Sequence, residues 1–453
     1  MAFVAIFGTS PFAIENGKGL TPPMGWRSWN LYGANVNQSL MERIMEGMIS
    51  KSRTVDGKPT SLCDLGYCDV GLDDNWQDCG AHGPHKYTYH SEVGVPLINT
   101  DRFPDMHAMT TKAHSLGLTA GWYLNNCICE DHCGSKRWNP NRPETDPKCY
   151  KGDAAKLVEF GFDSVKLDGC GAQLDLDLWA SLFNASGKSI MIENCHWGRT
   201  TPNATWCPWN TYRTSGDVRA SYGSVLRNLQ TTVKFANEGN SRPGCWAYPD
   251  MLEVGCQHGP GGPQDPGLTH AETRTHFGAW AIVSSPLVLS HDVTNSKVMD
   301  AVWPLISNKE AIAINQAWAG HSGSPFAQSN ELVVHSWREE PRAGDGDASD
   351  TARTRGELRT RTHTSAAWQY FYKPLARDGS KVAVLMMNHA TDSVDLTLDL
   401  SLVPGLRCGM EVGSHTCVVR DVWARKNLGT ARGSYVAKAV GGHDAAFIVL
   451  SSP

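Results

Sequence analysis

The chain has 453 residues, more than one hydrophobic core usually serves, so a large domain followed by a smaller one is expected. Hydrophobic residues make up 41% and charged residues 19% of the sequence, the balance of an ordinary globular protein. The formal net charge of -5 argues against nucleic acid or an anionic membrane surface as a partner. No apolar run approaches the roughly 18 residues that a membrane-spanning helix needs.

The amino-terminal residues and the cysteines indicate where the chain resides. Residues 1–17 begin with an apolar stretch and are interpreted as the remnant of a signal peptide or as an N-terminal extension. The 14 cysteines are even in number and partly clustered, which predicts several disulfides and a secreted, lysosomal, vacuolar or cell-surface protein. Scattered buried thiols in a reduced protein are the alternative. Glycosylation sequons agree with secretion and lie at Asn37, Asn184 and Asn203.

Residues 18–320 repeat a short β-rich run, a loop and a helical stretch, which indicates a parallel α/β fold. Eight strands close a (β/α)8 barrel of the TIM type, and the eight runs are 22–30, 68–76, 118–125, 163–169, 189–197, 211–218, 245–252 and 281–290. Apolar spacing predicts helices at 39–51, 105–116, 153–160 and 223–237. Most runs end in polar or aromatic residues, and the carboxyl ends of the strands are where this barrel carries its active site.

Residues 321–453 contain consecutive strands without helices, which predicts a C-terminal antiparallel β-sandwich. The expected strands are ELVVHSW, AAWQYFYKPL, KVAVLMMNHA, SVDLTLDLS, CVVRDVWA, SYVAKAV and AAFIVLS. Residues 339–363 are charged, glycine-rich and nearly free of large apolar side chains, so a mobile loop is expected there.

Two carboxyls are candidates for glycosidase chemistry. Asp168 ends the fourth run, and Lys166 lies on the same face of that strand because side chains alternate. A nearby lysine favours the ionised carboxylate that a glycosidase nucleophile must be. Asp217, which follows Arg213 in the sixth run, is the candidate acid/base, because two strands of a barrel can aim at one point. The alternatives are a salt bridge without chemistry and a helix N-cap, respectively.

Asp73 and Asp74 end the second run beside Trp76, a pattern typical of sugar binding, although a chance pair in a loop is the alternative. Aromatic residues at strand ends fit either a carbohydrate pocket or barrel packing, and they are Trp26, Trp29, Tyr123, Trp197, Trp209 and Trp246. The cluster of Cys127, Cys129, His132 and Cys133 lacks the two separated pairs of a structural zinc site. This spacing fits loop disulfides at least as well, so no metal is expected. No phosphate-binding loop or serine-hydrolase elbow is present, which argues against nucleotide binding and serine hydrolysis, and no other cofactor is expected.

The barrel segments resemble glycoside hydrolase family 27, the α-galactosidases and α-N-acetylgalactosaminidases. In family order, over residues 18–318, they are GLTPPMGWRSWN, LDDNW, RFPDMHAMTTKAHSLGLTAGWY, SVKLDGC, PGCWAYPDML and AIAINQAW. The C-terminal region resembles the family loosely, through KVAVLMMNHA. The resemblance implies a retaining, metal-independent hydrolase of terminal α-linked sugars. It also implies a disulfide from Cys170 to Cys127, Cys129 or Cys133, and another between Cys195 and Cys207.

The resemblance assigns roles to individual residues. It implies that Asp168 is the nucleophile and Asp217 the acid/base. Asp73 and Asp74 correspond to the pair that binds the 4- and 6-hydroxyls of the sugar, and Asp74 favours a hexose over an arabinopyranoside. The other pocket residues implied are Trp29, Tyr123, Lys166, Arg213 on the side of the 2-position, Asp250 and Met251.

The chain departs from the family in Cys195-His196-Trp197, where galactosidases carry Cys-Glu-Trp. His196 replaces the glutamate that reads the 2-hydroxyl; it could bond that hydroxyl or admit another substituent. Ala247 and Tyr248 also replace an Asn-Asp pair. The expected function is hydrolysis of terminal α-galactosides, with carbohydrate as the partner. The alternatives are an α-N-acetylgalactosaminidase, a β-L-arabinopyranosidase, or a non-catalytic glycan-binding or structural surface protein. The sequence leaves the aglycone and the oligomeric state open.

Overall fold

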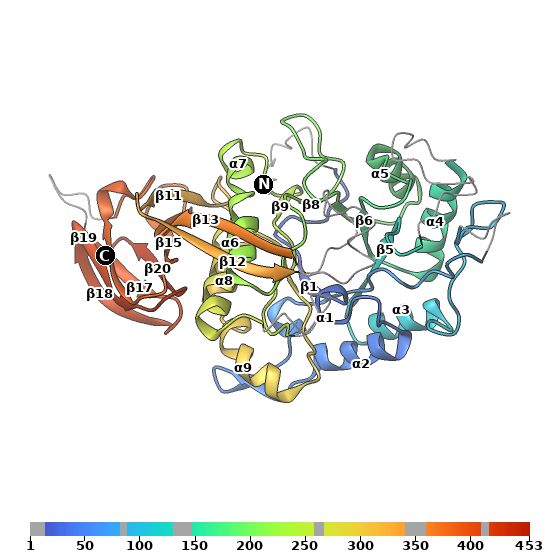
Figure 1. The fold of residues 1–453 in the computed structure, drawn as a ribbon, viewed down its shortest axis with the longest axis horizontal. Helices are drawn as coiled ribbons and strands as arrows, with labels where there is room; N and C mark the ends of the chain where they lie inside the picture. Colours follow the sequence, from blue (N-terminus) through green and yellow to red (C-terminus); the bar gives the residue numbers. More distant parts are fainter. Residues whose placement is uncertain (1–13, 82–87, 130–146, 258–266, 340–358, 409–415) are drawn as a thin grey trace, which may run out of the picture.

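The computed structural model describes residues 14–81, 88–129, 147–257, 267–339, 359–408 and 416–453, so most of the predicted signal remnant lies outside it. One sheet has eight parallel strands, one from each predicted run (Figure 1). They are β1 (Met24–Arg27), β4 (Asp69–Gly71), β5 (Thr119–Leu124), β6 (Ser164–Asp168), β7 (Met191–Cys195), β8 (Thr211–Arg213), β9 (Trp246–Tyr248) and β10 (Leu287–Leu289). The order β10-β1-β4-β5-β6-β7-β8-β9 curls as in a (β/α)8 barrel, which confirms the predicted fold class.

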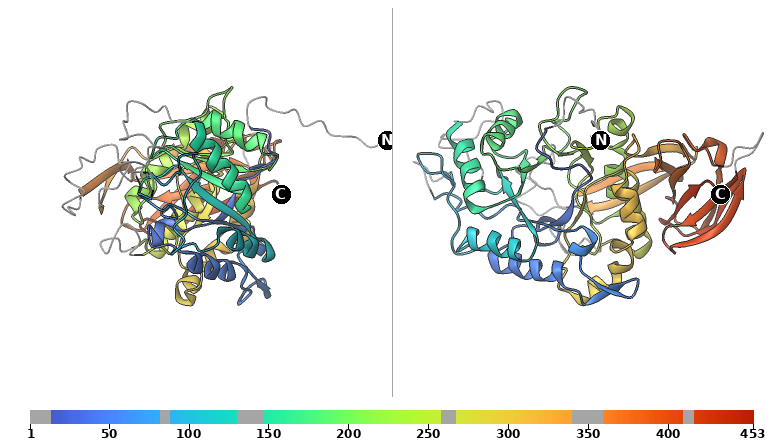
Figure 2. Two further views of the ribbon diagram at one scale, coloured as in Figure 1. Left: turned by 90° about the vertical axis from the view of Figure 1, so that its right-hand side faces the viewer. Right: turned by 180° about the vertical axis from the view of Figure 1, so that it is seen from behind.

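Helices surround this sheet (Figures 1 and 2). They are α1 (Trp29–Tyr32), α2 (Gln38–Ile49), α3 (Met106–Ser115), α4 (Pro147–Phe160), α5 (Leu176–Ala185), α6 (Tyr222–Gln230), α7 (Val233–Asn237), α8 (His270–Ile282), α9 (Ser296–Ile306) and α10 (Lys309–Gln316), and the hairpin of β2 (Arg53–Val55) and β3 (Lys58–Thr60) follows α2. In α2, Leu40, Ile44 and Met48 recur at helical spacing and are buried, while Asn37 caps the first turn. No helix in the described ranges combines the length and the apolar character needed to cross a bilayer.

A second eight-stranded sheet is antiparallel and forms the carboxy-terminal sandwich. It holds β11 (Ser324–Gln328), β14 (Trp368–Pro374), β15 (Lys381–Asn388), β16 (Val394–Asp399), β17 (Thr416–Asp421), β18 (Lys426–Arg432), β19 (Ser434–Val440) and β20 (Ala445–Ser451). On β15, Val382, Val384 and Met386 point into the sandwich core, whereas Ala383 and Leu385 pack with the barrel core. Both faces of β15 are therefore buried, and its sequence is a nearly continuous apolar run.

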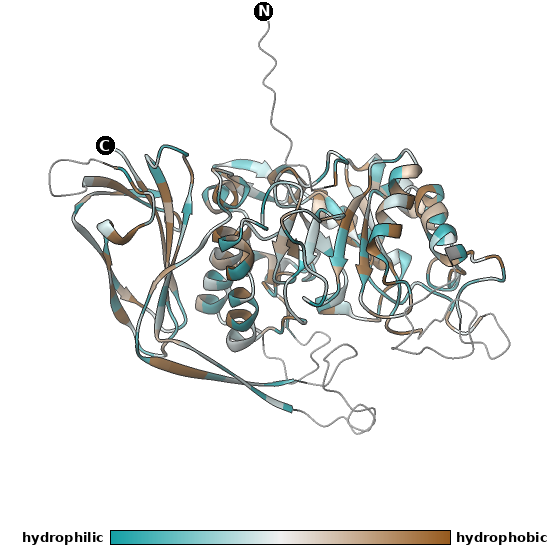
Figure 3. Cartoon of the chain, turned by 90° about the horizontal axis from the view of Figure 1, so that it is seen from above, coloured by the Kyte–Doolittle hydropathy of each residue, from teal (hydrophilic) through white to brown (hydrophobic). Residues whose placement is uncertain are grey.

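A separate two-stranded ribbon pairs β12 (Leu332–Glu339) with β13 (Arg359–Ala366). The loop predicted over 339–363 is wrong at both ends, because Glu339 ends β12 and residues 359–363 belong to β13; residues 340–358 lie outside the described ranges. The sequence of β13, RTRTHTSA, alternates but has no apolar face, so it does not stand out as a strand. The ribbon leaves the sandwich and runs along the barrel, where it packs on α6 (Figures 1 and 3).

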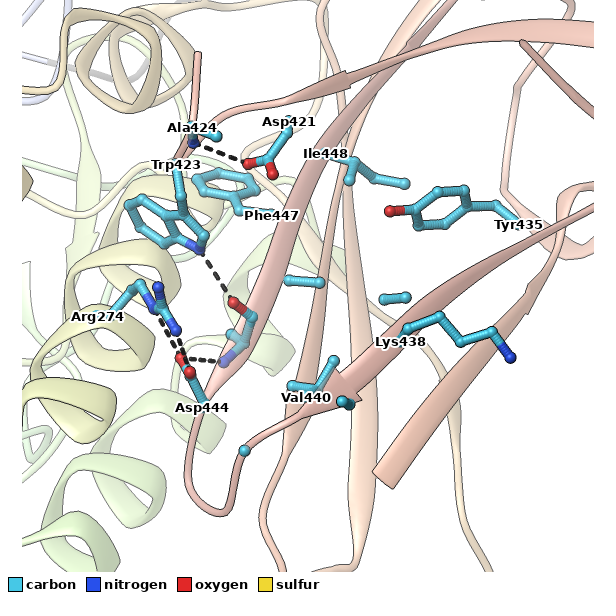
Figure 4. Close-up of a pocket in the computed structure, with 15 residues that line it drawn as sticks. Arg274, Asp421, Trp423, Ala424, Tyr435, Lys438, Val440, Asp444, Phe447 and Ile448 are labelled. Carbon is cyan, nitrogen blue, oxygen red and sulfur yellow. Dashed lines mark hydrogen bonds and ion pairs between the residues drawn. The ribbon is translucent and has the colours of Figure 1, made fainter. Parts of the chain in front are cut away.

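The sandwich is fixed to the barrel through α8. Arg274 of α8 forms an ion pair with Asp444, and its Nε donates to Asp444 Oδ1 at 2.7 Å (Figure 4). On the same side of the sandwich, the Trp423 indole donates to the carbonyl of Ala445 at 3.0 Å. These residues lie beside a cavity of about 430 Å³ that β19 and β20 line. This ion pair and the face of β15 that packs with the barrel core fix the sandwich against the barrel.

Candidate active site

Asp168 is the last residue of β6, and its side chain is buried at the carboxyl end of that strand. One carboxylate oxygen accepts a hydrogen bond from the Tyr123 hydroxyl at 2.9 Å, and the other accepts one from the Gly169 amide at 2.6 Å. Burial raises the pKa of Asp168 to about 7; the charge of Lys166 opposes this rise and that of Asp217 adds to it. The two predicted catalytic carboxyls are therefore close enough to interact electrostatically.

Lys166 shares a face of β6 with Asp168, as predicted, but its ion-pair partner is Asp73. The Lys166 Nζ lies 2.8 Å from Asp73 Oδ2, and both side chains are buried. Arg27 on β1 lies 3.9 Å from Asp73 and 3.7 Å from Glu193 on β7. Arg27 and Glu193 were not predicted as site residues from the sequence. Their positions inside otherwise apolar runs were the available indication, since a charge buried in a barrel must be paired.

Asp74 is held mainly by the backbone. Its Oδ2 accepts hydrogen bonds from the amides of Cys127 at 3.0 Å and Ile128 at 3.1 Å. The Tyr123 hydroxyl lies 3.3 Å from the same oxygen and thus lies between Asp74 and the candidate nucleophile. Strand β4 ends before Asp73, so the alternation of strand side chains no longer applies, and both aspartates reach this region.

Arg213, the last residue of β8, joins the candidate acid/base to the neighbouring strand. Its Nη2 lies 3.0 Å from Asp217 Oδ1 and 2.9 Å from Asp250 Oδ2. Asp250 also accepts hydrogen bonds from the amides of Val218 at 2.9 Å and Met251 at 2.8 Å. The Asp217 side chain keeps 17% of its surface exposed, and Asp217 is not the N-cap of α6, which begins five residues later. The loop from β8 to α6 thus presents a fixed, accessible carboxyl.

His196 directly follows β7 and is buried. Its Nδ1 lies 2.9 Å from the Thr200 hydroxyl, whereas its Nε2 has no hydrogen-bond partner among the described residues. Burial, assisted by the charge of Arg199, lowers the pKa of His196 to about 4, so the ring is neutral at pH 7. Trp29 and Met251, the other predicted pocket residues, follow β1 and β9 closely, on the same side of the sheet.

The bridge next to the candidate nucleophile is present, because Cys170 is bonded to Cys127. Cys133, another candidate partner of Cys170, is therefore excluded as that partner, and it lies outside the described ranges. Sulfur atoms of this bridge and a carboxylate oxygen of Asp168 lie within 4.8 Å of one another. They do not fit a metal site, since two sulfurs in a disulfide are not the thiolates that a metal binds.

The predicted bridge between Cys195 and Cys207 is wrong. Cys207 is bonded to Cys245, and Cys195 is a buried thiol outside any disulfide. Cys195 ends β7 with its side chain inside the barrel, where its Sγ accepts a hydrogen bond from Arg213 Nη1 at 3.4 Å. Cys207 lies instead in the segment before β8, beside the start of β9. The other bridges between described residues are Cys63–Cys68, Cys79–Cys129 and Cys408–Cys417.

A buried carboxyl and a more exposed one thus lie at the carboxyl ends of strands in a (β/α)8 sheet, among paired charges and aromatic rings. This arrangement is that of a glycoside hydrolase. Residues 21–317 match the family model of α-galactosidase A, and residues 365–450 match that of the α-galactosidase C-terminal β-sandwich domain. The chain belongs to the α-galactosidase family, glycoside hydrolase family 27, and is a glycosidase.

Individual relatives agree with this assignment. The chain is 30% identical to an α-galactosidase of Oryza sativa over 71% of this chain and 70% of that protein. It is 28% identical to α-galactosidase 3 of Arabidopsis thaliana over 99% of this chain and 87% of that protein. The solved structure of α-galactosidase I from Mortierella vinacea matches with a TM-score of 0.71 at 22% identity, covering 97% of this chain and 100% of that one. A β-L-arabinopyranosidase from Geobacillus stearothermophilus matches with a TM-score of 0.69 at 18% identity, covering 97% and 99%. At these identities the structural likeness concerns the fold.

Proposed function

We propose that the chain hydrolyses terminal α-galactosides with retention of the anomeric configuration, with Asp168 as nucleophile and Asp217 as acid/base. The difference between the two carboxyls carries the proposal: Asp168 is buried and held by Tyr123, whereas Asp217 is partly exposed and paired with Arg213. A retaining glycosidase needs two carboxyls that face one sugar, because a fixed carboxyl attacks the anomeric carbon and a more accessible one exchanges a proton with the aglycone or water. The relatives named α-galactosidases support the sugar.

The reaction proceeds in two steps. In the first, the Asp168 carboxylate attacks the anomeric carbon as the glycosidic C–O bond breaks, and Asp217 gives its proton to the departing oxygen. In the second, the Asp217 carboxylate takes a proton from water, whose oxygen attacks the anomeric carbon and releases Asp168. Two inversions give net retention. The chemistry requires the two carboxyls about 5 to 5.5 Å apart, and the charge of Lys166 favours the ionised Asp168 that begins the cycle.

Asp73 and Asp74 are proposed to bind the 4- and 6-hydroxyls of the sugar. Backbone amides hold the Asp74 carboxylate in place, and Lys166 holds that of Asp73, so neither needs to reorganise to accept a hydroxyl hydrogen. Hydrogen bonds to a charged group contribute about 1.5 to 3 kcal/mol. An arabinopyranoside lacks the 6-hydroxymethyl group and would forgo one of these bonds, so a galactoside is the favoured substrate.

The first test is hydrolysis of p-nitrophenyl α-galactoside by the purified protein. The α-N-acetylgalactosaminide, the β-L-arabinopyranoside and the β-galactoside are measured in parallel. We expect selective release from the α-galactoside. A preference for the N-acetyl sugar would place a larger 2-substituent beside His196, and a preference for the arabinopyranoside would contradict the role of Asp74. Release from none of the four would support a non-catalytic glycan-binding protein.

His196 is proposed to read the 2-hydroxyl of the sugar through its Nε2, which has no partner among the described residues. We expect His196→Ala to lower the preference for the galactoside over the 2-deoxygalactoside by about 10- to 100-fold in kcat/KM. This corresponds to the roughly 1 to 3 kcal/mol cost of leaving a buried polar group unpaired. His107→Ala, on the exposed surface of α3, is the matched control. An unchanged preference in His196→Ala would assign the 2-hydroxyl to another residue.

We infer that the chain works in an oxidising compartment. Five disulfides join pairs of described residues, and such bonds persist outside the reducing cytosol. The three sequon asparagines, Asn37, Asn184 and Asn203, are all exposed, as glycosylation requires. Mass spectrometry of the native protein tests this inference through intact disulfides and attached glycans.

A further inference from the structure

The ribbon of β12 and β13 lies in the stretch that neither family model covers. The first model ends at residue 317 and the second begins at residue 365, so all of β12 and all but the last two residues of β13 fall between them. Side chains of β12 alternate: His335, Trp337 and Glu339 are buried, whereas Leu332 and Val334 are exposed. The buried face of the ribbon is turned toward the barrel, where it packs on α6.

The ribbon approaches the first turn of α6 closely. A Cβ atom at Gly223 would lie 2.8 Å from the Cβ of His335 and 2.8 Å from ring atoms of Trp337. Such contacts are too short for real side chains, so this approach depends on a glycine at position 223. The residues just before α6 form the loop that carries Asp217. The ribbon therefore lies against the structural support of the candidate acid/base.

Glu339 makes the first link to this loop. Its Oε2 accepts a hydrogen bond from the Trp337 indole at 2.8 Å, and its Oε1 accepts one from Arg361 Nε at 2.8 Å. The Nε of Arg219, two residues after Asp217, lies 3.7 Å from Glu339 Oε2. Burial by itself would raise the pKa of Glu339, but these hydrogen bonds and arginine charges outweigh burial and lower the pKa, so the carboxylate is ionised at neutral pH.

Arg227 makes the second link. Its Nη2 donates a hydrogen bond to the backbone carbonyl of Asp217 at 2.9 Å. Its guanidinium lies 5.4 Å from the centroid of the Trp337 ring, within the range of a cation–π contact. The ribbon thus reaches the acid/base loop twice, through the backbone of Asp217 itself and through the side chain of Arg219.

We propose that Glu339 and Trp337 are positioning residues for the acid/base: through Arg219 and Arg227 they fix the backbone from which Asp217 reaches the glycosidic oxygen. The inference rests on the proposed role of Asp217. A displacement of about 1 Å can cost a catalytic group roughly 10²-fold in rate, and general acid catalysis contributes about 10²- to 10⁴-fold. A loosened loop therefore weakens proton donation and leaves the attack by the nucleophile nearly unchanged.

The test is Glu339→Gln, assayed as kcat/KM on aryl α-galactosides whose leaving phenols differ in acidity. We expect about a 10-fold loss on the phenyl galactoside, whose basic leaving group needs the proton, and less than about a twofold loss on the 2,4-dinitrophenyl galactoside. Arg338→Gln changes one charge on the exposed face of the same strand and should match wild type on both substrates. Trp337→Phe keeps the ring over Arg227, removes the indole donor, and gives a second variant if Glu339→Gln does not fold.

Asp217→Asn in the same series separates the two levels of inference. If Asp217→Asn shows a loss that grows with leaving-group basicity while the ribbon variants lose equally on all substrates, or lose nothing, the positioning role is overturned and the acid/base assignment stands. If Asp217→Asn itself shows no dependence on the leaving group, the proposed acid/base fails, and the positioning role fails with it.

Discussion

Asp168→Asn is expected to lower turnover of every α-galactoside by on the order of 10⁴-fold or more, because an amide does not form the glycosyl ester on which the first step depends. The loss should be large for an activated dinitrophenyl galactoside as well as for a phenyl galactoside, since a better leaving group does not replace the missing nucleophile. Initial rates on the two substrates measure this. Asp163→Asn, just before the opposite end of the same strand, is the matched control and should retain activity.

The same variant is expected to be more stable than wild type at neutral and alkaline pH. The pKa of Asp168 is about 7 in the fold, above its ordinary value of 3.8, so the unfolded chain releases this proton first. The free energy of unfolding therefore decreases as pH rises from about 4 to about 7. Above pH 7 the fold remains destabilised by the buried Asp168 carboxylate. Asparagine does not ionise, so the variant avoids this pH-dependent destabilisation. The melting temperature of Asp168→Asn relative to wild type should thus be higher at pH 8 than at pH 4. A variant that is unfolded at both would contradict this expectation.

Asp217→Asn is expected to lose about 10²- to 10⁴-fold in kcat/KM on the phenyl galactoside and little on the 2,4-dinitrophenyl galactoside. The dinitrophenolate leaves without a proton, whereas the phenolate does not. The second step still lacks its base, so a covalent intermediate should accumulate and give a burst of dinitrophenol. Stopped-flow absorbance measures the burst. Equal losses on both substrates would assign the acid to another residue.

Azide gives an independent check on the same carboxyl. In Asp217→Ala, azide has room to attack the covalent intermediate without a base, so it should accelerate turnover and yield α-galactosyl azide, the product of retention. The β-azide would instead indicate direct displacement and would remove Asp168 as the nucleophile. Asp250→Ala, which removes the neighbouring partner of Arg213, should show no azide product.

The barrel could be predicted from sequence because its eight runs are short and largely apolar, and most of them end in polar or aromatic residues. The same rule failed for β13 and β18, whose side chains are mostly exposed or half-buried and whose sequences therefore carry no apolar face. The continuous apolar run of β15 was recognised as a strand, but its burial on both sides depends on contact with α8, which no local pattern encodes.

Candidate site residues could be chosen from the sequence where they lie in short motifs, as with Asp73, Asp74 and Asp168. Partners brought together from distant strands could not. Lys166 forms its ion pair with Asp73, which follows another strand. Cys195 has an inward position on β7 and so does not meet Cys207, a geometry that spacing along the chain does not reveal. The contacts of the ribbon with the acid/base loop also join segments that are far apart in sequence, so they could not be predicted from local patterns either.

The most direct measurement is mass spectrometry of the protein after brief incubation with 5-fluoro-α-galactosyl fluoride, whose covalent intermediate hydrolyses slowly. We predict that a proteolytic peptide containing Asp168 gains the mass of one fluorogalactosyl group, and that fragmentation places the label on that side chain. A label on a different carboxyl, or steady turnover of p-nitrophenyl α-galactoside to β-galactose as the first product without any labelled peptide, would contradict a retaining mechanism at Asp168.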